Sequence, residues 1–302
     1  SCCDDPLPGS AEVAIIGAGL IGVTAAYFLH QAGVADICVI DRGGVLGEAS
    51  GANAGGLWFA QQSPELGPIA ALARTSSVLY DELASRFDFD FRRCGMVELL
   101  DDERQIVEAE ARLATVREAG FRAEKVAGKH ARSLEPGLGF TPSGALYYPD
   151  EACLHPARLG AELVRHLRGN GVRFCLGNEV GELTPQVQTA QGSLAAKTTV
   201  IASGAWTPQV TRALGWEPPI KPMRGTLLAV EPLPEILHHT VLTARYYYWQ
   251  LRSGHIGGGG SIDDVGFEQG VDPATTKLIR EEMERLVPAV VGQPTACAWS
   301  GF

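Results

Sequence analysis

The segment EVAIIGAGLIGVTAAYFLHQAG (residues 12–33) decides the fold of the chain. Its first six residues, 12–17, form a short apolar run rich in β-branched side chains, as in a buried parallel strand. From Leu20 to Ala32 the pattern becomes helical, and Gly33 is suited to end the helix. A second buried strand, DICVID, follows at 36–41. A strand, a helix and a strand in such close succession predict a right-handed βαβ unit.

The glycines between the strand and the helix carry the strongest functional signal in the sequence. Gly17 permits a tight turn, Gly19 lets the backbone approach a pyrophosphate, and Gly22 lets the helix pack closely on the strand. The amino terminus of the helix then offers unpaired N–H groups to the phosphates. Asp41, at the end of the second strand, is the acid expected to bond ribose hydroxyls. A merely tight turn does not explain this acid, so the pattern predicts dinucleotide binding.

The composition is that of a globular protein without a polyanionic partner. Of 302 residues, 45% are hydrophobic and 20% are charged, and the formal net charge is −10. This charge argues against a nucleic-acid or anionic-membrane partner. No apolar run approaches the ~18 residues that span a bilayer, and the Asp- and Pro-rich start is unlike a signal peptide. The 7 cysteines show no CxxC and no His/Cys ligand spacing, so we expect a reduced, cytoplasmic protein without a metal site.

Helical and strand patterns alternate along the rest of the chain. Residues 88–100 alternate in polarity like an antiparallel pair of strands, and GALYYP at 144–149 is a further strand candidate. The block at 220–260 is strand-rich and aromatic. Its GGGGS run (257–261) predicts a strand end or bulge that a neighbouring backbone passes closely, rather than a flexible linker. The predicted helices span 68–86, 102–119, 156–169 and 273–287, the last with Asp272 as N-cap.

The two kinds of segment are interleaved along the sequence. Nucleotide-type segments occur at about 11–60 and again at 150–210, whereas antiparallel material occurs at 88–100 and 218–270. We therefore expect an α/β fold with two discontinuous domains. The first domain comprises 11–87 and 150–217, and the second comprises 88–149 and 218–302.

The loop after Asp41 indicates which of two classes of dinucleotide cofactor the chain binds. Residues 42–58, RGGVLGEASGANAGGLW, form a long run of small residues without helical or strand periodicity. A nicotinamide-binding domain would proceed at once to its next αβ unit, so an NAD-linked dehydrogenase is the lesser alternative. A loop of small residues can instead lie flat along a flavin and donate its backbone N–H groups.

The fingerprint, the acid and this loop together resemble the FAD-dependent amino-acid oxidoreductases. These include glycine oxidase, sarcosine oxidase, D-amino-acid dehydrogenases and the β-type subunits of opine, hydroxyproline and cyanide-forming glycine dehydrogenases. The resemblance continues in order through GALYYPDEACLHPARL, GNEVGEL, VIASGAW, PIKPMRGTLLAVE, YYYWQLRSGHIGGGGS and ACAWSGF. It implies a Rossmann-like FAD-binding domain interleaved with an α+β substrate domain built on an antiparallel sheet.

The resemblance also implies which residues contact FAD. The diphosphate would lie at Leu20 and Ile21 and beside Ala49 and Ser50, the ADP ribose at Asp41 and Arg42, the isoalloxazine along Ala54, Gly55 and Gly56, and the adenine at the backbone of Val180, while Ser203 and Gly204 close over the dinucleotide. Without the resemblance, Val180 is equally a core residue of a strand, and Gly55 and Gly204 are ordinary turn glycines.

On the substrate side, Tyr247 resembles the family tyrosine whose hydroxyl bonds the substrate carboxylate. Its register is open, because Tyr246, Tyr247 and Tyr248 are consecutive and alternate faces in a strand. Arg224, in KPMRG, is either a second anchor for an anionic substrate or flavin oxygen, or a surface arginine. The histidines have no partner acid nearby in sequence, and we interpret them as solvated loop residues: His155, His238 and His239.

The activity implied by the resemblance is oxidation of the C–N bond of a small amine or amino or imino acid. A hydride would pass to flavin N5 and leave an imine, a reaction that requires orientation and a dry face but no obligatory protein base. Either O2 or a partner redox subunit would take the electrons, in a homo- or hetero-oligomer. The competing interpretation is a non-catalytic or partner-dependent flavoprotein subunit of a hetero-oligomeric dehydrogenase.

The two ends of the sequence suggest a shortened chain. It begins without methionine and ends on ACAWSGF, where relatives in the resembled family continue into an Arg-Pro pair that anchors the substrate carboxylate. We therefore expect residues 1–302 alone to bind FAD weakly and to show little activity, and the downstream sequence to restore both.

Overall fold

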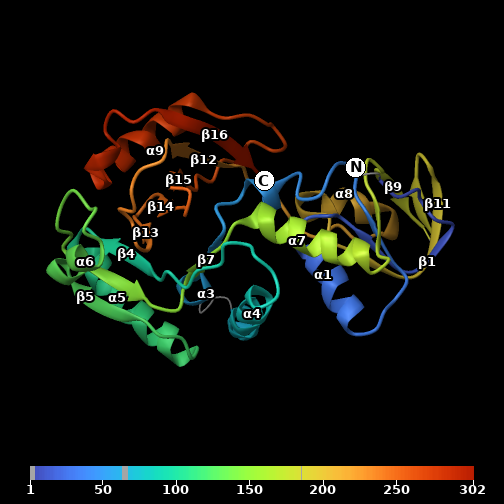
Figure 1. Ribbon diagram of the computed structural model, residues 1–302, viewed down its shortest axis with the longest axis horizontal. Helices are drawn as coiled ribbons and strands as arrows, with labels where there is room; N and C mark the ends of the chain where they lie inside the picture. Colours follow the sequence, from blue (N-terminus) through green and yellow to red (C-terminus); the bar gives the residue numbers. More distant parts are fainter. Residues whose placement is uncertain (1–3, 63–66, 185) are drawn as a thin grey trace.

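The computed structural model describes residues 4–62, 67–184 and 186–302. Its two main sheets lie at opposite ends of the long axis of the molecule (Figure 1). The blue and yellow parts of the chain make one end, and the green, orange and red parts make the other. Each end therefore combines an early and a late part of the sequence.

Counting only the described residues, the first sheet has six strands in the order β8-β2-β1-β11-β10-β9. The four strands from β8 to β11 in this order are parallel, and the remaining two pairings are antiparallel. The strands span β1 Ser10–Ile16, β2 Ile37–Ile40, β8 Arg173–Cys175, β9 Val180–Leu183, β10 Val187–Thr189 and β11 Gly192–Ile201.

The central strands β1 and β2 are buried on both faces, as their apolar runs predict, whereas β11 is largely exposed or half-buried. Helices α1 (Leu20–Gln31) and α7 (Pro156–Gly169) cover one face, on which Ile15 of β1 packs. The neighbouring residue Ile16 points to the opposite face, where it belongs to a cluster with Val187 of β10 and Leu194 of β11. Helix α1 ends one residue earlier than predicted, and Gly33 follows its C-cap with φ +95°.

The second sheet has eight strands within the described part of the chain, in the order β16-β12-β15-β14-β13-β4-β6-β5. All its pairings are antiparallel except that of β13 with β4. The strands span β4 Met96–Leu100, β5 Glu124–Ala127, β6 Gly144–Tyr148, β12 Gly225–Val230, β13 Thr240–Leu242, β14 Tyr247–Gln250, β15 Ile256–Gly259 and β16 Thr295–Gly301.

The antiparallel pair predicted within residues 88–100 is wrong. Only β4 forms there, because Asp90 and Gly95 both have positive φ and interrupt the extended run. Arg92 instead makes an isolated bridge with Cys153. That residue belongs to β7 (Ala152–Cys153), which pairs with β3 (Gly56–Leu57) in a small separate sheet.

The glycine run includes the end of β15, and at Gly259 a neighbouring backbone passes closely, as predicted: a Cβ atom there would lie 2.4 Å from the Thr226 carbonyl oxygen. The two preceding glycines contact aromatic rings. A Cβ atom at Gly257 would lie 2.3 Å from the Trp249 ring, and one at Gly258 would lie 2.5 Å from the Tyr248 ring. Only a strand without side chains can therefore pair with the aromatic strand β14 here.

The predicted long helices are present with slightly shifted ends. Asp272 caps α9 by accepting hydrogen bonds from the N–H groups of Ala274 and Thr275. The remaining helices span α2 Ala49–Ala52, α3 Phe59–Gln62, α4 Pro68–Ala84, α5 Glu103–Glu118, α6 Gly128–Leu134, α8 Thr207–Thr211 and α9 Pro273–Leu286, with 3-10 turns at Gly204–Trp206, Arg212–Leu214 and Pro288–Val290. Among the described residues, none of these helices has the length and apolar character needed to cross a membrane.

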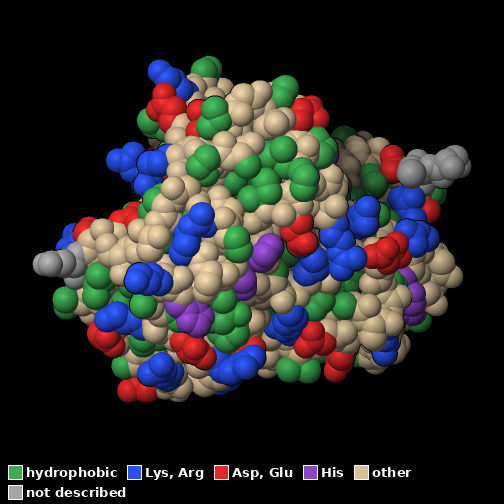
Figure 2. Space-filling model, turned by 60° about the vertical axis from the view of Figure 1, so that its left-hand side comes forward, with side chains coloured by type: hydrophobic (Ala, Val, Ile, Leu, Met, Phe, Trp, Pro, Cys, Tyr) green, Lys and Arg blue, Asp and Glu red, His purple; other side chains and the backbone are tan. Residues whose placement is uncertain are grey.

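The surface mixes charges of both signs. Figure 2 shows lysine and arginine side chains interspersed with aspartate and glutamate over the face seen from the left-hand end of Figure 1. This face carries no extended patch of one charge sign.

Candidate dinucleotide and substrate site

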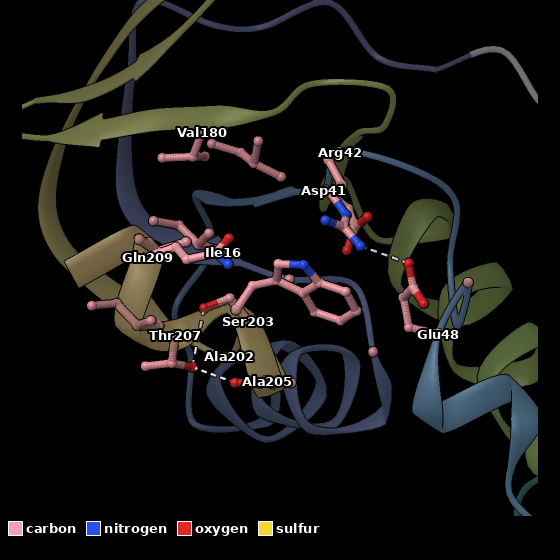
Figure 3. A pocket seen from close by; sticks show the side chains of 18 of the residues that line it. Ile16, Asp41, Arg42, Glu48, Val180, Ala202, Ser203, Ala205, Thr207 and Gln209 are labelled. Atoms are coloured by element: carbon pink, nitrogen blue, oxygen red, sulfur yellow. Dashed lines mark hydrogen bonds and ion pairs between the residues drawn. The ribbon is translucent and has the colours of Figure 1, made fainter. Parts of the chain in front are cut away.

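A cavity of about 660 Å³ opens at the carboxyl ends of β1, β2 and β11. This edge of a parallel sheet is where α/β folds bind their ligands, and the volume lies within the range of cofactor sites. Figure 3 shows Arg42 and Glu48 on one side of the cavity, with Thr207 and Gln209 on the other. Residues proposed from sequence that line it are Gly17, Gly19, Ile21, Asp41, Arg42, Ala49, Ser50, Val180, Ser203 and Gly204.

The fingerprint glycines hold the floor of the cavity at backbone contact distance. A Cβ atom at Gly17 would lie 2.3 Å from the Ala202 carbonyl oxygen, and one at Gly22 would lie 1.9 Å from the Gly17 carbonyl oxygen. Gly17 also has φ +112°, a conformation that side chains rarely adopt. Strand, turn and helix can therefore approach one another this closely only with glycine at both positions.

Asp41 is fixed at the cavity wall by two backbone donors. The N–H of Ala18 donates to Oδ2 at 2.7 Å, and the N–H of Gly43 donates to Oδ1 at 2.8 Å. Each carboxylate oxygen keeps a further lone pair. The side chain is thus held in place by the glycine turn and still has capacity to accept bonds from hydroxyl groups.

Trp206 is a cavity residue that sequence reasoning missed. The Arg42 guanidinium lies 3.9 Å from the centre of its ring, and Arg42 also forms a 2.7 Å ion pair with Glu48. The other side of the indole stacks on Phe267 at 4.9 Å between ring centroids. The segment VIASGAW contained the signal, because a large aromatic residue lies two positions after the turn glycine.

The turn after β11 is closed by hydroxyl groups. Ser203 Oγ and Thr207 Oγ1 are 3.2 Å apart, and Thr207 Oγ1 donates to the Gly204 carbonyl at 2.7 Å (Figure 3). Gly204 has φ +54°. The turn therefore presents its backbone to the cavity in a conformation that suits glycine.

The remaining proposed cofactor residues are not among those that line this cavity: Leu20, Gly22, Ala54, Gly55 and Gly56. Leu20 donates its N–H to Ser50 Oγ at 2.9 Å, which joins the amino terminus of α1 to α2. Ala54, Gly55 and Gly56 lead into β3, next to β7. A Cβ atom at Gly55 would lie 2.0 Å from the Leu154 carbonyl oxygen, so this segment is also held by close backbone contact.

Glu151 anchors the chain after β3, a role without any signal in the sequence. Its buried carboxylate accepts hydrogen bonds from the N–H groups of Phe59, Ala60 and Gln61 at 2.6, 2.9 and 2.8 Å. Burial raises the pKa of Glu151 to about 7, although these three N–H groups favour the charged form. The partner residues are about ninety positions away in sequence, and the motif context of Glu151 gives no hint of them.

Tyr247 lies in an aromatic group that faces β3. Its ring contacts Trp58 edge-on at 4.6 Å between centroids, and a Cβ atom at Gly260 would lie 2.3 Å from its Cε1 atom. Tyr248 is buried on the other face and points its hydroxyl at the Ile279 carbonyl of α9. Of the three consecutive tyrosines, Tyr247 is therefore the one beside Trp58.

Two properties of this aromatic group concern polar chemistry. Burial raises the pKa of Tyr247 to about 12, so its hydroxyl stays protonated at neutral pH. The Trp58 indole N–H is buried and has no hydrogen-bond partner among the described residues. The group thus combines an apolar surface with two donors.

Arg224 is held by the loop that follows β15. It is only 8% exposed, so it is not a surface arginine. Its Nε lies 3.7 Å from Asp263 Oδ2, and its Nη1 donates to the Glu268 carbonyl at 3.2 Å.

The interpretation of His239 as a histidine without a partner acid is wrong. Its Nδ1 lies 2.6 Å from Glu135 Oε1, and the Glu135 carboxylate is fully buried. Glu135 also accepts hydrogen bonds from the N–H groups of His238 and His239. The partner is about a hundred residues away in sequence, which is why local spacing did not reveal it.

Comparison with known proteins identifies the family. A family model described as FAD dependent oxidoreductase (DAO) matches residues 12–302. The chain is 29% identical to glycine oxidase from Pseudomonas putida, over 97% of this chain and 82% of that protein. It is 27% identical to hydrogen cyanide synthase subunit HcnC from Pseudomonas aeruginosa, over 96% of this chain and 81% of that protein.

The fold is shared with solved structures of the same kind. The crystal structure of glycine oxidase from Geobacillus kaustophilus matches with a TM-score of 0.91 at 23% identity, over 97% of this chain and 82% of that one. The chain belongs to the FAD-dependent oxidoreductase family. The predicted family, fold class and FAD cofactor are confirmed, and the NAD-linked alternative is excluded.

Proposed function

We propose that this chain uses FAD to oxidise the C–N bond of a small amino or imino acid to an imine. The names of the relatives, glycine oxidase and hydrogen cyanide synthase subunit, support this substrate class. The observation that carries the proposal is the edge-on contact of Trp58 with Tyr247, because it joins the chain after β3 to the aromatic strand of the second sheet. A substrate held there would lie between the two sheets.

The residues of the cavity fit the ADP half of FAD. Gly17 and Gly19 line the cavity at the amino terminus of α1, where a diphosphate would bind, and the buried Gly22 lets the helix pack against the Gly17 turn. The free lone pairs of Asp41 suit ribose hydroxyls, and Arg42 on Trp206 adds a cation at the cavity wall. We assign residues 11–87 and 150–217 to the FAD-binding domain, and residues 88–149 and 218–302 to the substrate domain.

The segment from Ala54 to Gly56 is our candidate for the chain that runs past the isoalloxazine. Gly56 is exposed, and a Cβ atom there would lie 2.5 Å from the Trp58 indole nitrogen, so only glycine fits where this segment passes the ring. The pairing of β3 with β7 and the hydrogen bonds to the Glu151 carboxylate fix the segment in this position.

Bound FAD supplies the two-electron acceptor for the reaction. The Tyr247 hydroxyl, kept protonated by burial, donates to the substrate carboxylate and orients it. The Trp58 ring excludes water beside it and restricts the space to small side chains. Orientation and exclusion of water are what such a reaction requires of the protein.

Flavin bleaching tests the proposal. The FAD-loaded protein is kept under argon and mixed with a panel of glycine, sarcosine, proline, hydroxyproline, D-amino acids and opines. We expect at least one small amino or imino acid to abolish the visible flavin band and to yield a carbonyl product. If none bleaches the flavin, the protein does not oxidise this substrate class.

The electron acceptor is the second part of the proposal. The similarity to a hydrogen cyanide synthase subunit favours a partner redox subunit as an alternative to O2. Reoxidation of the bleached flavin by dissolved O2, compared with an artificial electron-accepting dye, distinguishes the two. Rapid reoxidation by O2 would contradict dependence on a partner.

A further inference from the structure

Two cysteines lie together where residues 92–95 run beside β7. Arg92 and Cys153 exchange two backbone hydrogen bonds, of 2.8 and 2.9 Å, and the N–H of Gly95 donates to the Glu151 carbonyl at 2.8 Å. The 92–95 segment therefore carries one more residue than the 151–153 segment opposite, which is a β-bulge. Cys94 lies in this bulge, two residues from Arg92, which is the residue opposite Cys153.

The two thiols differ in access. Cys94 is half-buried and Cys153 is buried, so an oxidant in solution reaches Cys94 first. A second thiol pair offers a contrast inside the same chain. The sulfur atoms of Cys38 and Cys175 are 3.4 Å apart, but both residues are completely buried in the six-stranded sheet.

The surroundings of Cys94 favour its thiolate. The hydrogen bond from Cys153 lowers the pKa of Cys94 to about 7, and the Arg92 guanidinium and the Thr240 hydroxyl act in the same direction against the effect of burial. The same contact and burial raise the pKa of Cys153. At neutral pH about half of Cys94 is then thiolate, against a few per cent for an ordinary thiol.

We propose that Cys94 is a peroxide-reactive thiol and that Cys153 is its resolving partner. A partly accessible thiol next to a second cysteine is the arrangement of reversible redox sites. The Cys94 thiolate attacks hydrogen peroxide, the O–O bond breaks, and Cys94 becomes a sulfenic acid while the leaving hydroxide takes a proton from the solvent to become water. The Cys153 sulfur then attacks the Cys94 sulfur, and a second water leaves as the disulfide forms. Two thiols are oxidised and one peroxide is reduced to two waters.

This chemistry does not depend on the proposed function, because the peroxide can come from any source. The site is nevertheless close to the proposed flavin segment, since Cys153 pairs directly with Gly56 in the β3–β7 sheet. Oxidation would place a disulfide on β7, the strand that pairs with the proposed flavin segment.

Peptide mapping tests the proposal on the intact FAD-loaded chain. The protein is treated at neutral pH with a small excess of hydrogen peroxide, alkylated after denaturation and digested. We expect a Cys94–Cys153 disulfide peptide that dithiothreitol reverses, while Cys38 and Cys175 stay fully alkylated. Its formation should be about fivefold faster than peroxide oxidation of an ordinary peptide thiol, because the larger thiolate fraction outweighs the lower nucleophilicity.

Two variants separate the roles of the cysteines. In Cys153→Ser, dimedone should trap the sulfenic acid on Cys94, whereas in Cys94→Ser the oxidation of Cys153 should fall by about tenfold or more. Undiminished oxidation of Cys153 in Cys94→Ser would overturn the proposal. So would a wild-type map in which exposed Cys297 is oxidised while Cys94 and Cys153 remain alkylated. The wild-type map decides by itself if either variant fails to fold.

Discussion

The cavity beside the six-stranded sheet and the aromatic group around Tyr247 are built in opposite ways. The cavity is made by backbone that has no room for side chains, as at Gly17 and Gly22. The aromatic group is made by side chains from distant segments, with Trp58 and Tyr247 as its centre. The first region should therefore be sensitive to any added atom, whereas the second should depend on which polar atoms its rings carry.

The largest effect should come from adding a side chain beneath the cavity, where α1 packs against the Gly17 turn. In Gly22→Val, the new Cβ would lie 1.9 Å from the Gly17 carbonyl oxygen, so strand and helix must separate. We expect a loss of about 3–5 kcal/mol of stability, a large part of what a domain possesses. Thermal unfolding and the FAD content of the purified protein measure it.

Gly169→Ala is the matched control, because a Cβ atom there meets no atom within 4 Å. Its stability should change by less than about 0.5 kcal/mol. If Gly22→Val retained FAD and unfolded at the temperature of the wild type, the close contact would not be what holds the cavity together.

The contrast between backbone contacts and contacts of distant side chains also explains which features could be predicted from the sequence. Gly17, Gly22 and Asp41 lie within one short stretch whose spacing is dictated by a strand, a turn and a helix, so their placement followed from local pattern. The sequence also predicted a strand in the aromatic segment and close contact at the glycine run. Bulky rings that face glycines on a neighbouring strand have few other arrangements.

The parts that were not predicted depend on contacts between distant residues. Glu151 with the N–H of Phe59, and Glu135 with His239, join positions about ninety to a hundred residues apart. No spacing rule encodes such pairs. The strand pair expected before β4 failed for a related reason, since Arg92 pairs with Cys153 of a separate sheet instead of with a neighbour in sequence.

The second largest effect should come from removing one polar atom from the aromatic group. Tyr247→Phe keeps the contact with Trp58 but removes the hydroxyl that we propose to bind the substrate carboxylate. A hydrogen bond to a charged group contributes about 1.5–3 kcal/mol, so kcat/KM should fall by about ten- to a hundredfold. Steady-state kinetics measure this loss, with the flavin spectrum unchanged.

Tyr248→Phe is the control on the opposite face of the same strand. It loses a long hydrogen bond of 3.4 Å to the Ile279 carbonyl, which should lower stability by at most about 1 kcal/mol and leave KM unchanged. Equal kinetic losses in the two variants would mean that the aromatic group acts by packing alone.

The third effect concerns Glu151, which ties the chain after β3 to β7 and so connects the two regions. Its pKa is about 7 in the folded protein and 4.5 in its ordinary state. Between these values the folded chain holds a proton that the unfolded chain has lost. The free energy of unfolding should therefore fall as the pH rises from about 4.5 to about 7, by about 2–3 kcal/mol from this group.

Glu151→Gln removes this titration but keeps an acceptor oxygen for the N–H groups of α3. Denaturant unfolding at about pH 5 and about pH 7.5 should show the fall in the wild type and a smaller fall in the variant. Glu124→Gln makes the same chemical change at an exposed position of β5 and should leave the fall intact. If Glu151→Gln and the wild type show equal pH dependence, the three N–H donors keep Glu151 ionised in spite of its burial. The anchor of β3 would then be as insensitive to pH as the glycine contacts of the cavity.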